Sequence, residues 1–371
     1  MDVKATDDSQ TNGHTSTLQK VFPMAGGHGE ESYTKNSGLQ ALVTNATVLA
    51  LFEALEQVTL PSNGSPVVVA DLGCSSGPNT IVDVARIVDK LRERLPAEDT
   101  EFQAYFNDLP SNDFNNLFQL LSNDSRAKDF HTAGVPGSFF GRLFPKASVH
   151  VFHAAVSGHW LSKVPDAVLD KESAAYNKGR SWIRNAPSAV TRCFQQQALE
   201  DLKSFLLARA AELAPGGLLF FYPIGRTTSD PNESMNDFLD NLQPDLDEIL
   251  SDLVAEGLLT EEQHDTFNIP VYQRSIDDIK EALECCGSMF NLVITKMHKF
   301  NIAEGLETTD ATDRAKQLKG AYKAVYNSKV EAQFGKTVAD VIWQRYENML
   351  VKKLGLRSEF CWFCIVGLIR N

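Results

Sequence analysis

The segment from Val67 to Asn79, VVVADLGCSSGPN, constrains the fold of this chain more than any other stretch. Its apolar, β-branched first half is typical of a parallel strand that is buried on both faces. Asp71 ends the apolar run, a loop with Gly73 and Gly77 follows, and a helical pattern begins at about Thr80. We therefore predict a strand, a glycine turn and a helix N-terminus, a junction at which a ligand can contact bare backbone.

Three interpretations of this loop are open from its residues alone. An acid after the strand suits a ligand with a positive group or hydroxyls, and S-adenosylmethionine has both, in its ammonium group and its ribose. Gly73 to Gly77 also matches G-x-S-x-G, the nucleophile elbow of α/β-hydrolases, which would make Ser75 a nucleophile. In the third interpretation the glycines only relieve strain in an ordinary α/β turn.

The composition indicates a globular protein with an acidic surface. Of the 371 residues, 43% are hydrophobic and 22% are charged, which is ordinary for a folded domain. Lys and Arg number 35 against 48 Asp and Glu, so the net charge is −13. Such a surface repels phosphate backbones and anionic lipids, so we expect no nucleic-acid partner, whereas a small anionic substrate is compatible with a local pocket.

Neither a membrane span nor a targeting signal is expected. No apolar run reaches the ~18 residues needed to cross a bilayer. Residues 1–20 are mostly small and polar, and they predict a disordered tail without the apolar segment of a signal peptide. The six cysteines are scattered, and the one close pair, Cys361 and Cys364, falls in an apolar strand that places the two on opposite faces. Reduced thiols and the lack of a recognisable targeting signal together predict a cytoplasmic protein.

The first part of the chain alternates between strand and helix patterns, which predicts a parallel sheet covered on both faces. We expect helices over 37–58, from about residue 80, over 111–121 and over 189–213, and strands over 67–71, 102–106, 147–156 and 218–225. From about residue 232 the pattern is mainly helical, over 234–265 and 311–353, with strands at 289–296 and 361–369. Helical insertions of this kind would form a cap over the carboxyl edge of the sheet, where α/β proteins bind ligands.

The order of the elements favours the S-adenosylmethionine interpretation over the hydrolase. A hydrolase elbow follows several strands and a preceding oxyanion motif, but here it would lie on the first clear strand. A cofactor site predicts an acid at the end of the second strand to bind ribose hydroxyls, and Asp108 is placed for that role. It also predicts rings for the adenine, which Phe139 and Phe140 could supply.

Six segments of the chain resemble the signatures of one family. They are MAGGHGEESYTKNSGLQ, ADLGCSSGPN, FNDLPSNDFN, GVPGSFFGRLFP, HWLSKVP and FNIPVY, and they are similar to those of the plant SABATH methyltransferases. That family contains the salicylate, benzoate, jasmonate and indole-acetate carboxyl methyltransferases and the caffeine-pathway N-methyltransferases. The resemblance runs in order from about Phe22 to the C-terminus.

The resemblance implies an α/β fold of the Rossmann-like class I S-adenosylmethionine-dependent methyltransferase type, with seven strands and a mostly helical cap, usually dimeric. The methyltransferase core with the cofactor site would span 21–230. The cap, with an interspersed core strand, would span 231–355, and the final core strand would span 356–371.

The resemblance also implies site residues. Cofactor contacts are expected at Tyr33, Ser37, Asp71, Cys74, Asn79, Asp108, Leu109, Ser138 and Phe139. Acceptor contacts are expected at Gln40, Val156, His159, Trp160, Gln243 and Tyr322, with Val325 and Cys361 also facing the acceptor pocket. Gln40 and Trp160 would hold the acceptor carboxylate, because both offer N–H donors. Some relatives bind magnesium at positions that match Asn177, Asp265, Phe267 and Asn268, and these oxygen donors suit a hard cation.

The implied reaction is methyl transfer from S-adenosylmethionine to a small carboxylic acid. Such an acid has a pKa near ~4 and is already ionised in the cell, so no general base is needed. Val156 occupies a position where relatives commonly have Tyr, which leaves room for a longer aromatic acid of the cinnamate or indole-acetate type. Two alternatives remain, N-methylation of a xanthine-type alkaloid and a non-catalytic protein that binds a small acid.

Overall fold

The computed structural model describes residues 23–371 except 28, 30, 31, 63, 96–99, 234–236, 303–305, 307, 309 and 354–359. The tail that the sequence predicts over 1–20 lies outside the described residues. The strands are β1 Val67–Leu72, β2 Phe102–Asp108, β3 His131–Pro136, β4 Val149–Ala155, β5 Leu213–Tyr222, β6 Phe290–Asn301 and β7 Phe360–Arg370. The helices are α1 Tyr33–Asn36, α2 Gly38–Leu55, α3 Asn79–Arg92, α4 Phe114–Asn123, α5 Ser188–Glu212, α6 Asp237–Ala255, α7 Glu261–Asp265, α8 Ile276–Glu284, α9 Ala311–Phe334 and α10 Lys336–Lys353.

These strands form one seven-stranded sheet in the order β3-β2-β1-β4-β5-β7-β6. Neighbours from β3 to β5 are parallel, and β7 is antiparallel to both β5 and β6. The order reverses between β1 and β4, which is the switch point where open α/β sheets bind their ligands. The fold class that the sequence predicts is therefore confirmed.

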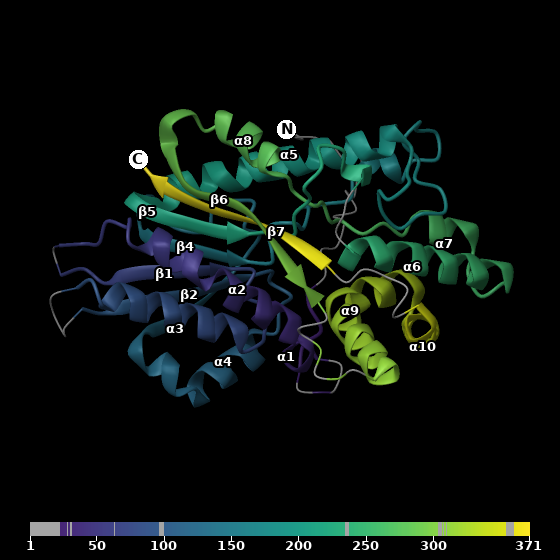
Figure 1. Cartoon of the computed structure of the whole chain (residues 1–371), viewed down its shortest axis with the longest axis horizontal. Helices are drawn as coiled ribbons and strands as arrows, with labels where there is room; N and C mark the ends of the chain where they lie inside the picture. Colours follow the sequence, from purple (N-terminus) through teal and green to yellow (C-terminus); the bar gives the residue numbers. More distant parts are fainter. Residues whose placement is uncertain are drawn as a thin grey trace, which may run out of the picture.

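Two layers of helices cover the sheet. Figure 1 shows α3 and α4 below it and α5 and α8 above it, and α2 lies on the α3 side because side chains of the two helices share one apolar cluster. Alternate residues of β1 divide between these layers, since Val69 packs in the core on the α2 and α3 side and Ala70 in the core on the α5 side. The same alternation separates Cys361 and Cys364, as expected for a strand, and both are free thiols.

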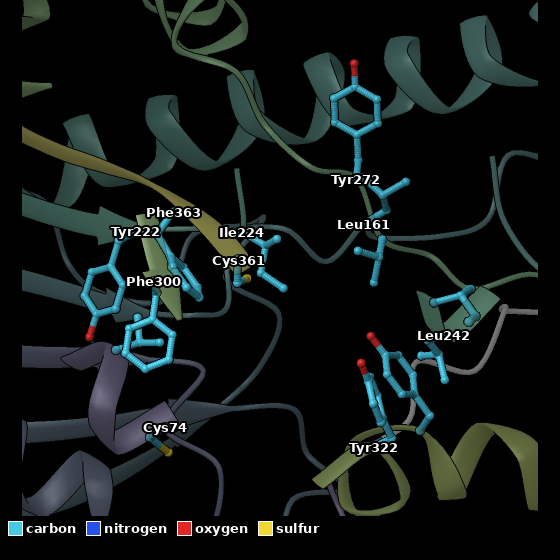
Figure 2. Close-up of a cluster of buried hydrophobic side chains, with 14 of the residues drawn as sticks. Cys74, Leu161, Tyr222, Ile224, Leu242, Tyr272, Phe300, Tyr322, Cys361 and Phe363 are labelled. Atoms are coloured by element: carbon cyan, nitrogen blue, oxygen red, sulfur yellow. The ribbon is translucent and has the colours of Figure 1, made fainter. Parts of the chain in front are cut away.

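The remaining helices form the cap. In Figure 1, α6, α7, α9 and α10 gather beyond the end of the sheet to which the arrow of β5 points. Side chains of the cap join the core of the sheet in one apolar cluster, which Figure 2 shows with Leu242 of α6 and Tyr322 of α9 facing Leu161 and Cys361. The cap therefore closes over the carboxyl edge of the sheet.

Helix α2 is unusually apolar for its length. By length and composition alone it could cross a membrane, with a mean hydropathy of 1.4 over 18 residues, of which 39% are buried. Polar residues such as Gln40 and Asn45 interrupt its sequence, so no long apolar run stands out there. Val43 and Leu51 on its inner side pack with Val69 of the sheet, as in a core helix, while Leu49 on its outer side is 77% exposed.

Candidate cofactor and acceptor site

A pocket lies at the carboxyl ends of β1 and β4, at the switch point of the sheet. It is lined by Tyr33, Gln40, Thr44, Asp71, Gly73, Cys74, Gly77, Asn79, Thr80, Asp83, Ala155 and Val156. Four of the nine expected cofactor residues and two of the expected acceptor residues belong to this lining. The structure therefore brings members of both predicted groups into one cavity.

The glycine loop owes its path to a close approach of the chain. Gly73 has φ +78°, and a Cβ atom there would lie 2.6 Å from Cβ of Ser157 and 3.7 Å from the ring of Phe139. Only glycine fits both the left-handed backbone and this space. Phe139 follows β3 and Gly73 follows β1. The contact therefore places the Phe139 ring, which is expected to stack on the adenine, beside the glycine loop.

Asp108 anchors the same loop from the end of β2. One carboxylate oxygen accepts a 2.7 Å hydrogen bond from the Ser75 N–H, and the other accepts one of 2.7 Å from the Leu109 N–H. Burial raises the pKa of Asp108 to about 6, although both N–H groups oppose that shift. Ser75 itself is buried, with φ 53°. A carboxylate that already orders the loop can also accept ribose hydroxyls, because each oxygen has two lone pairs.

The N-terminal segment forms the other wall. The Asn79 amide donates to the backbone oxygen of Ser37 at 3.0 Å, and the ring of Tyr33 would lie 3.3 Å from a Cβ atom on Gly77. The backbone N–H of Ala25 donates to Ala324 of α9 at 2.9 Å. The segment thus joins the glycine loop to the cap, and it places Tyr33 and Ser37 at the pocket.

The loop after β3 is held by a buried charge pair on α5. Arg209 donates to the backbone oxygens of Phe139 and Gly141 at 3.0 and 2.9 Å. Glu212 accepts from the backbone N–H groups of Leu143 and Phe144 at 2.5 and 2.9 Å. Ser138 lies directly before these anchored residues, so α5 fixes the loop that contains both expected cofactor contacts.

Asp71 lies at the floor of the pocket with both oxygens in hydrogen bonds. Nδ1 of His153 is 2.8 Å from one oxygen, and the Thr80 hydroxyl donates to the other at 2.5 Å. Asp83 of α3 lies in the same lining, and burial raises its pKa to about 6, with Asp71 adding to the shift and His153 opposing it. The floor of the pocket is therefore acidic, which suits a cationic ligand.

The expected acceptor residues divide into two groups. Gln40 and Val156 line the pocket, and the Gln40 side-chain oxygen is buried without a hydrogen-bond partner among the described residues. His159 and Trp160 continue the chain after Val156, with their rings 5.7 Å apart and Trp160 5.8 Å from the ring of Tyr326 on α9. Burial lowers the pKa of His159 to about 3, so this imidazole is neutral at cellular pH.

The two acceptor residues expected from the cap are buried in it. The Gln243 amide is used in hydrogen bonds with the backbone of Arg184 and the carboxylate of Asp247. It has no free group to offer an acceptor in this arrangement. Tyr322 packs edge-on against Tyr346 at 5.6 Å, and it lies in the apolar cluster that contains Cys361. Val325 is half-buried beside the same cluster.

The four residues expected at a magnesium site lie together between the core and the cap. The Asn177 amide donates to Oδ1 of Asn268 at 2.7 Å. Asp265 accepts from Tyr176 and from the Gly179 N–H, and Phe267 lies between Asp265 and Asn268 in the chain. The Asn177 oxygen is buried without a partner among the described residues, so a cation could take it. Among the residues that the structure describes, no group of three or more His, Cys, Asp or Glu is placed to hold a metal ion.

Comparison with known proteins decides the family. A family model described as SAM dependent carboxyl methyltransferase matches residues 19–371. Indole-3-acetate O-methyltransferase 1 of Arabidopsis thaliana is 39% identical over 351 residues, which cover 89% of this chain and 90% of that protein. The chain belongs to the SABATH family of S-adenosylmethionine-dependent carboxyl methyltransferases.

Other relatives of this SABATH methyltransferase differ in the acceptors that their names give. Gibberellic acid methyltransferase 2 of Arabidopsis thaliana is 35% identical, covering 96% of this chain and 95% of that protein. Caffeine synthase 1 of Camellia crassicolumna is 34% identical, covering 92% and 94%. The solved structure of loganic acid methyltransferase with SAH has a TM-score of 0.84 and 30% identity, and covers 94% of this chain and 99% of that one.

Family membership settles the three interpretations of the glycine loop. The protein is an enzyme that uses S-adenosylmethionine, so the nucleophile-elbow interpretation of Ser75 is wrong. The individual residue contacts stay predictions from the sequence. The structure adds residues that the sequence analysis did not single out, namely Thr80, Asp83, His153, Arg209 and Glu212. The sequence feature that could have revealed them is a polar residue within an apolar pattern, such as His153 within the strand VHVFHAA.

Proposed function

We propose that this SABATH methyltransferase forms methyl esters of a small hydrophobic carboxylic acid, of the cinnamate, benzoate or indole-acetate type. The observation that supports it most is the position of Gln40, an uncharged amide that lines the same pocket as Asp71 and Cys74. An amide N–H can hold a carboxylate without protonating it. The similarity to an indole-3-acetate methyltransferase supports an aromatic acid.

For this reaction the chain must orient the cofactor and the acceptor and exclude water from the space between them. S-adenosylmethionine supplies an electrophilic methyl group on its sulfonium. Asp71 and Asp108 would hold its ammonium and ribose, and Phe139 would stack on its adenine. Gln40 and Trp160 would orient the acceptor carboxylate, which is ionised already because such acids have a pKa near ~4. Holding the two reactants in line can contribute on the order of 7–11 kcal/mol.

A neutral His159 suits this mechanism. A positive charge beside the acceptor would stabilise the carboxylate and oppose its loss of charge during methyl transfer, whereas the pKa of His159 is about 3 because of burial. The cap and the apolar cluster around Leu161 and Tyr322 exclude water from this side. In a dry pocket, the cancellation of sulfonium and carboxylate charges favours the transfer.

The test uses purified protein, labelled S-adenosylmethionine and a panel of aromatic, indole, fatty and terpenoid acids, with esters identified by mass. We expect Gln40→Ala and Trp160→Ala to lose turnover while they still bind S-adenosylhomocysteine. Glu53→Ala, on the exposed side of α2, is the matched control and should keep full activity. Full activity in both pocket variants would refute the carboxylate clamp, and the absence of ester from every acid would refute the proposal.

N-methylation of a xanthine-type alkaloid is the second candidate. The 34% identity to caffeine synthase 1 supports it. The same assay with xanthosine and 7-methylxanthine distinguishes the two reactions, because N-methyl products differ from esters in mass and resist mild alkali. The remaining alternative, a non-catalytic acid-binding protein, does not agree with membership of a family of methyltransferases.

We propose that the enzyme is a homodimer through the outer face of α2. The helix has a mean hydropathy of 1.4, and on its outer face Ala46 is exposed and Leu49 is 77% exposed. Apolar surface of this kind is typical of protein contacts. We expect Leu49→Glu to convert a dimer into a monomer in analytical ultracentrifugation. Leu258→Glu, at a 53% exposed position outside α2, should leave the dimer intact.

We propose that magnesium binds the cluster of Asn177, Asp265, Phe267 and Asn268 and stabilises the contact between core and cap. The donors would be one carboxylate, two amide oxygens and the Phe267 backbone oxygen, a set that fits a hard cation. Magnesium chloride should raise the melting temperature of the protein, EDTA should reverse this, and Asp265→Asn should remove the effect. We also propose a cytoplasmic location, which a fluorescent fusion in plant cells would test.

A further inference from the structure

Asp71 of β1 and His153 of β4 lie next to each other on neighbouring strands in the middle of the sheet. The parallel register of β1 and β4 pairs the two residues directly, so their side chains extend to the same face. The side chains of Asp71 and His153 are 5% and 0% exposed, and Oδ1 and Nδ1 are 2.8 Å apart. Because a carboxylate only accepts, Nδ1 has the hydrogen and donates it to Asp71.

The opposite side of the imidazole is enclosed by rings and polar groups from three further elements. The rings of Phe220 and Tyr222 on β5 lie 6.3 and 5.7 Å from that of His153. The Tyr222 hydroxyl is 3.0 Å from the Thr44 hydroxyl of α2, and Asp83 of α3 is the second acid that faces the imidazole. Nε2 of His153 is buried without a hydrogen-bond partner among the described residues. A proton on Nε2 therefore has no acceptor there.

We propose that His153 is a positioning residue that fixes the Asp71 carboxylate for the cationic end of the cofactor, and that a proton on its Nε2 competes with that cation. The inference rests on Asp71 facing the ammonium group, as the sequence predicts. Thr80 and His153 together hold both oxygens of the carboxylate, so its plane is set before the cofactor arrives. No other part of the reaction requires His153.

Competition follows from the charges that share this floor. Burial alone lowers the pKa of His153, but the hydrogen bond and charge of Asp71 and the charge of Asp83 outweigh it and raise the pKa. Without cofactor, the two acids therefore favour an imidazolium. A cofactor ammonium beside Asp71 adds a second cation, and the Nε2 proton then leaves to solvent while the Nδ1 hydrogen stays on His153 and is still donated to Asp71. Binding thus releases a proton below the pKa of free His153, and affinity increases with pH until that pKa is passed.

The test is calorimetric and does not depend on turnover. S-adenosylhomocysteine, which retains the ammonium group, is titrated into the full-length enzyme at pH 5.5 to 7.5, in buffers of different ionisation enthalpy. We expect release of up to one proton at the acidic end, falling towards zero as pH rises. The affinity should rise over the same interval, by at most about tenfold per pH unit.

Three variants assign the proton. In His153→Asn, the amide N–H replaces Nδ1 but cannot gain a proton, so affinity at pH 7.5 should stay within about threefold of the wild type and proton release should fall well below that of the wild type. His153→Leu removes the donor and should weaken binding about tenfold across the range. Asp83→Asn should still release a proton, because the imidazole remains.

The outcomes separate two failures. Proton release that persists in His153→Asn and disappears in Asp83→Asn would make Asp83 the source and would overturn the inference. Binding by the wild type without proton release at any pH would overturn it as well. A wild type that does not bind S-adenosylhomocysteine would refute the cofactor site, and the inference with it. Thermal melts establish that each variant is folded, and if His153→Leu unfolds, the wild type and His153→Asn still decide.

Discussion

Arg209 and Glu212 lie one turn apart on α5 and form an ion pair of 2.6 Å in which both side chains are fully buried. The two terminal nitrogens of Arg209 donate to the backbone of the loop after β3, and Oε1 of Glu212 accepts from it. Burial lowers the pKa of Arg209 to about 10, so it remains charged at cellular pH. The pair therefore anchors the loop that contains Ser138 and Phe139 to helix α5.

Arg209→Met should destabilise the protein by about 3–5 kcal/mol, because Glu212 would remain as a buried charge without its partner. The loop would also lose two hydrogen bonds, so affinity for S-adenosylhomocysteine should fall. Urea unfolding and calorimetry measure the two effects. The matched control is Arg142→Met, whose side chain is 42% exposed and pairs with the same Glu212 at 3.3 Å. An exposed partner of this kind contributes about 1 kcal/mol or less, and equal losses in both variants would contradict the role of Arg209.

Asp83 should make the protein less stable as pH rises. Its pKa in the folded protein is about 6, against an ordinary value of 3.8, chiefly because of burial. A raised carboxyl pKa means that the folded state holds the proton more tightly, so this contribution to stability is present below pH 4 and is lost as pH rises through 6. Asp83→Asn should therefore be more stable than the wild type by about 3 kcal/mol at pH 7, and similar to it at pH 4.

Urea unfolding at the two pH values tests this expectation. The variant should keep part of the pH dependence of the free energy of unfolding, because the pKa of Asp108 is also raised to about 6. Asp89→Asn is the control, because Asp89 is exposed on the same helix. A variant of Asp83 that is less stable than the wild type at pH 7 would show that the charge is needed by its neighbours.

Much of the fold could be predicted from local patterns. The strand, glycine turn and helix from Val67 onward appear as β1 and α3, and the long helix over 189–213 appears as α5. The edge strand β3 was missed, because HTAGVP is partly exposed and lacks an apolar run. Helix α8 was also missed, since it has nine residues and starts at a capping box at Ser275 rather than a long periodic stretch.

The site was predictable only in part, for a physical reason. Residues beside a glycine loop, such as Asp71 and Asp108, are found from the strand ends that precede them. His153 and Asp71 are 82 positions apart in the chain, and their pairing depends on the register of two strands. Nor does the sequence reveal that the Gln243 amide is used in hydrogen bonds, because one partner, Arg184, lies 59 positions away in the chain, although the other, Asp247, lies on the same helix.

Gly73→Ala should abolish cofactor binding and lower stability by about 3 kcal/mol. The left-handed backbone alone costs alanine about 1–2 kcal/mol, and the contact of 2.6 Å with Ser157 adds the cost of moving a packed strand end. Gly257→Ala separates the two terms, because Gly257 has φ +75° and open space around it. It should lose only the backbone term and keep affinity for S-adenosylhomocysteine. Equal destabilisation of the two variants in urea unfolding would show that the Ser157 contact relaxes freely.

Val156 should determine which acids fit the enzyme. It lines the pocket, and its φ of 47° is a rare conformation for a β-branched residue. A tyrosine there would avoid the β-branched strain and fill the space next to Gln40. We therefore expect Val156→Tyr to be at least as stable as the wild type and to favour short acids such as salicylate over indole-acetate. The ratio of kcat/KM for the two acids should change by about tenfold or more.

Val156→Ala distinguishes bulk from strain in this prediction. Alanine also removes the β-branch but adds no volume, so the variant should keep the acid preference of the wild type. Methyl-ester formation from both acids, measured with the three proteins at equal cofactor saturation, gives the comparison. If Val156→Tyr and Val156→Ala change the preference alike, the backbone at this position sets the acceptor and the side chain does not. If neither changes it, the acceptor lies away from Val156, and the aromatic wall formed by Trp160 and Tyr326 becomes the next surface to vary.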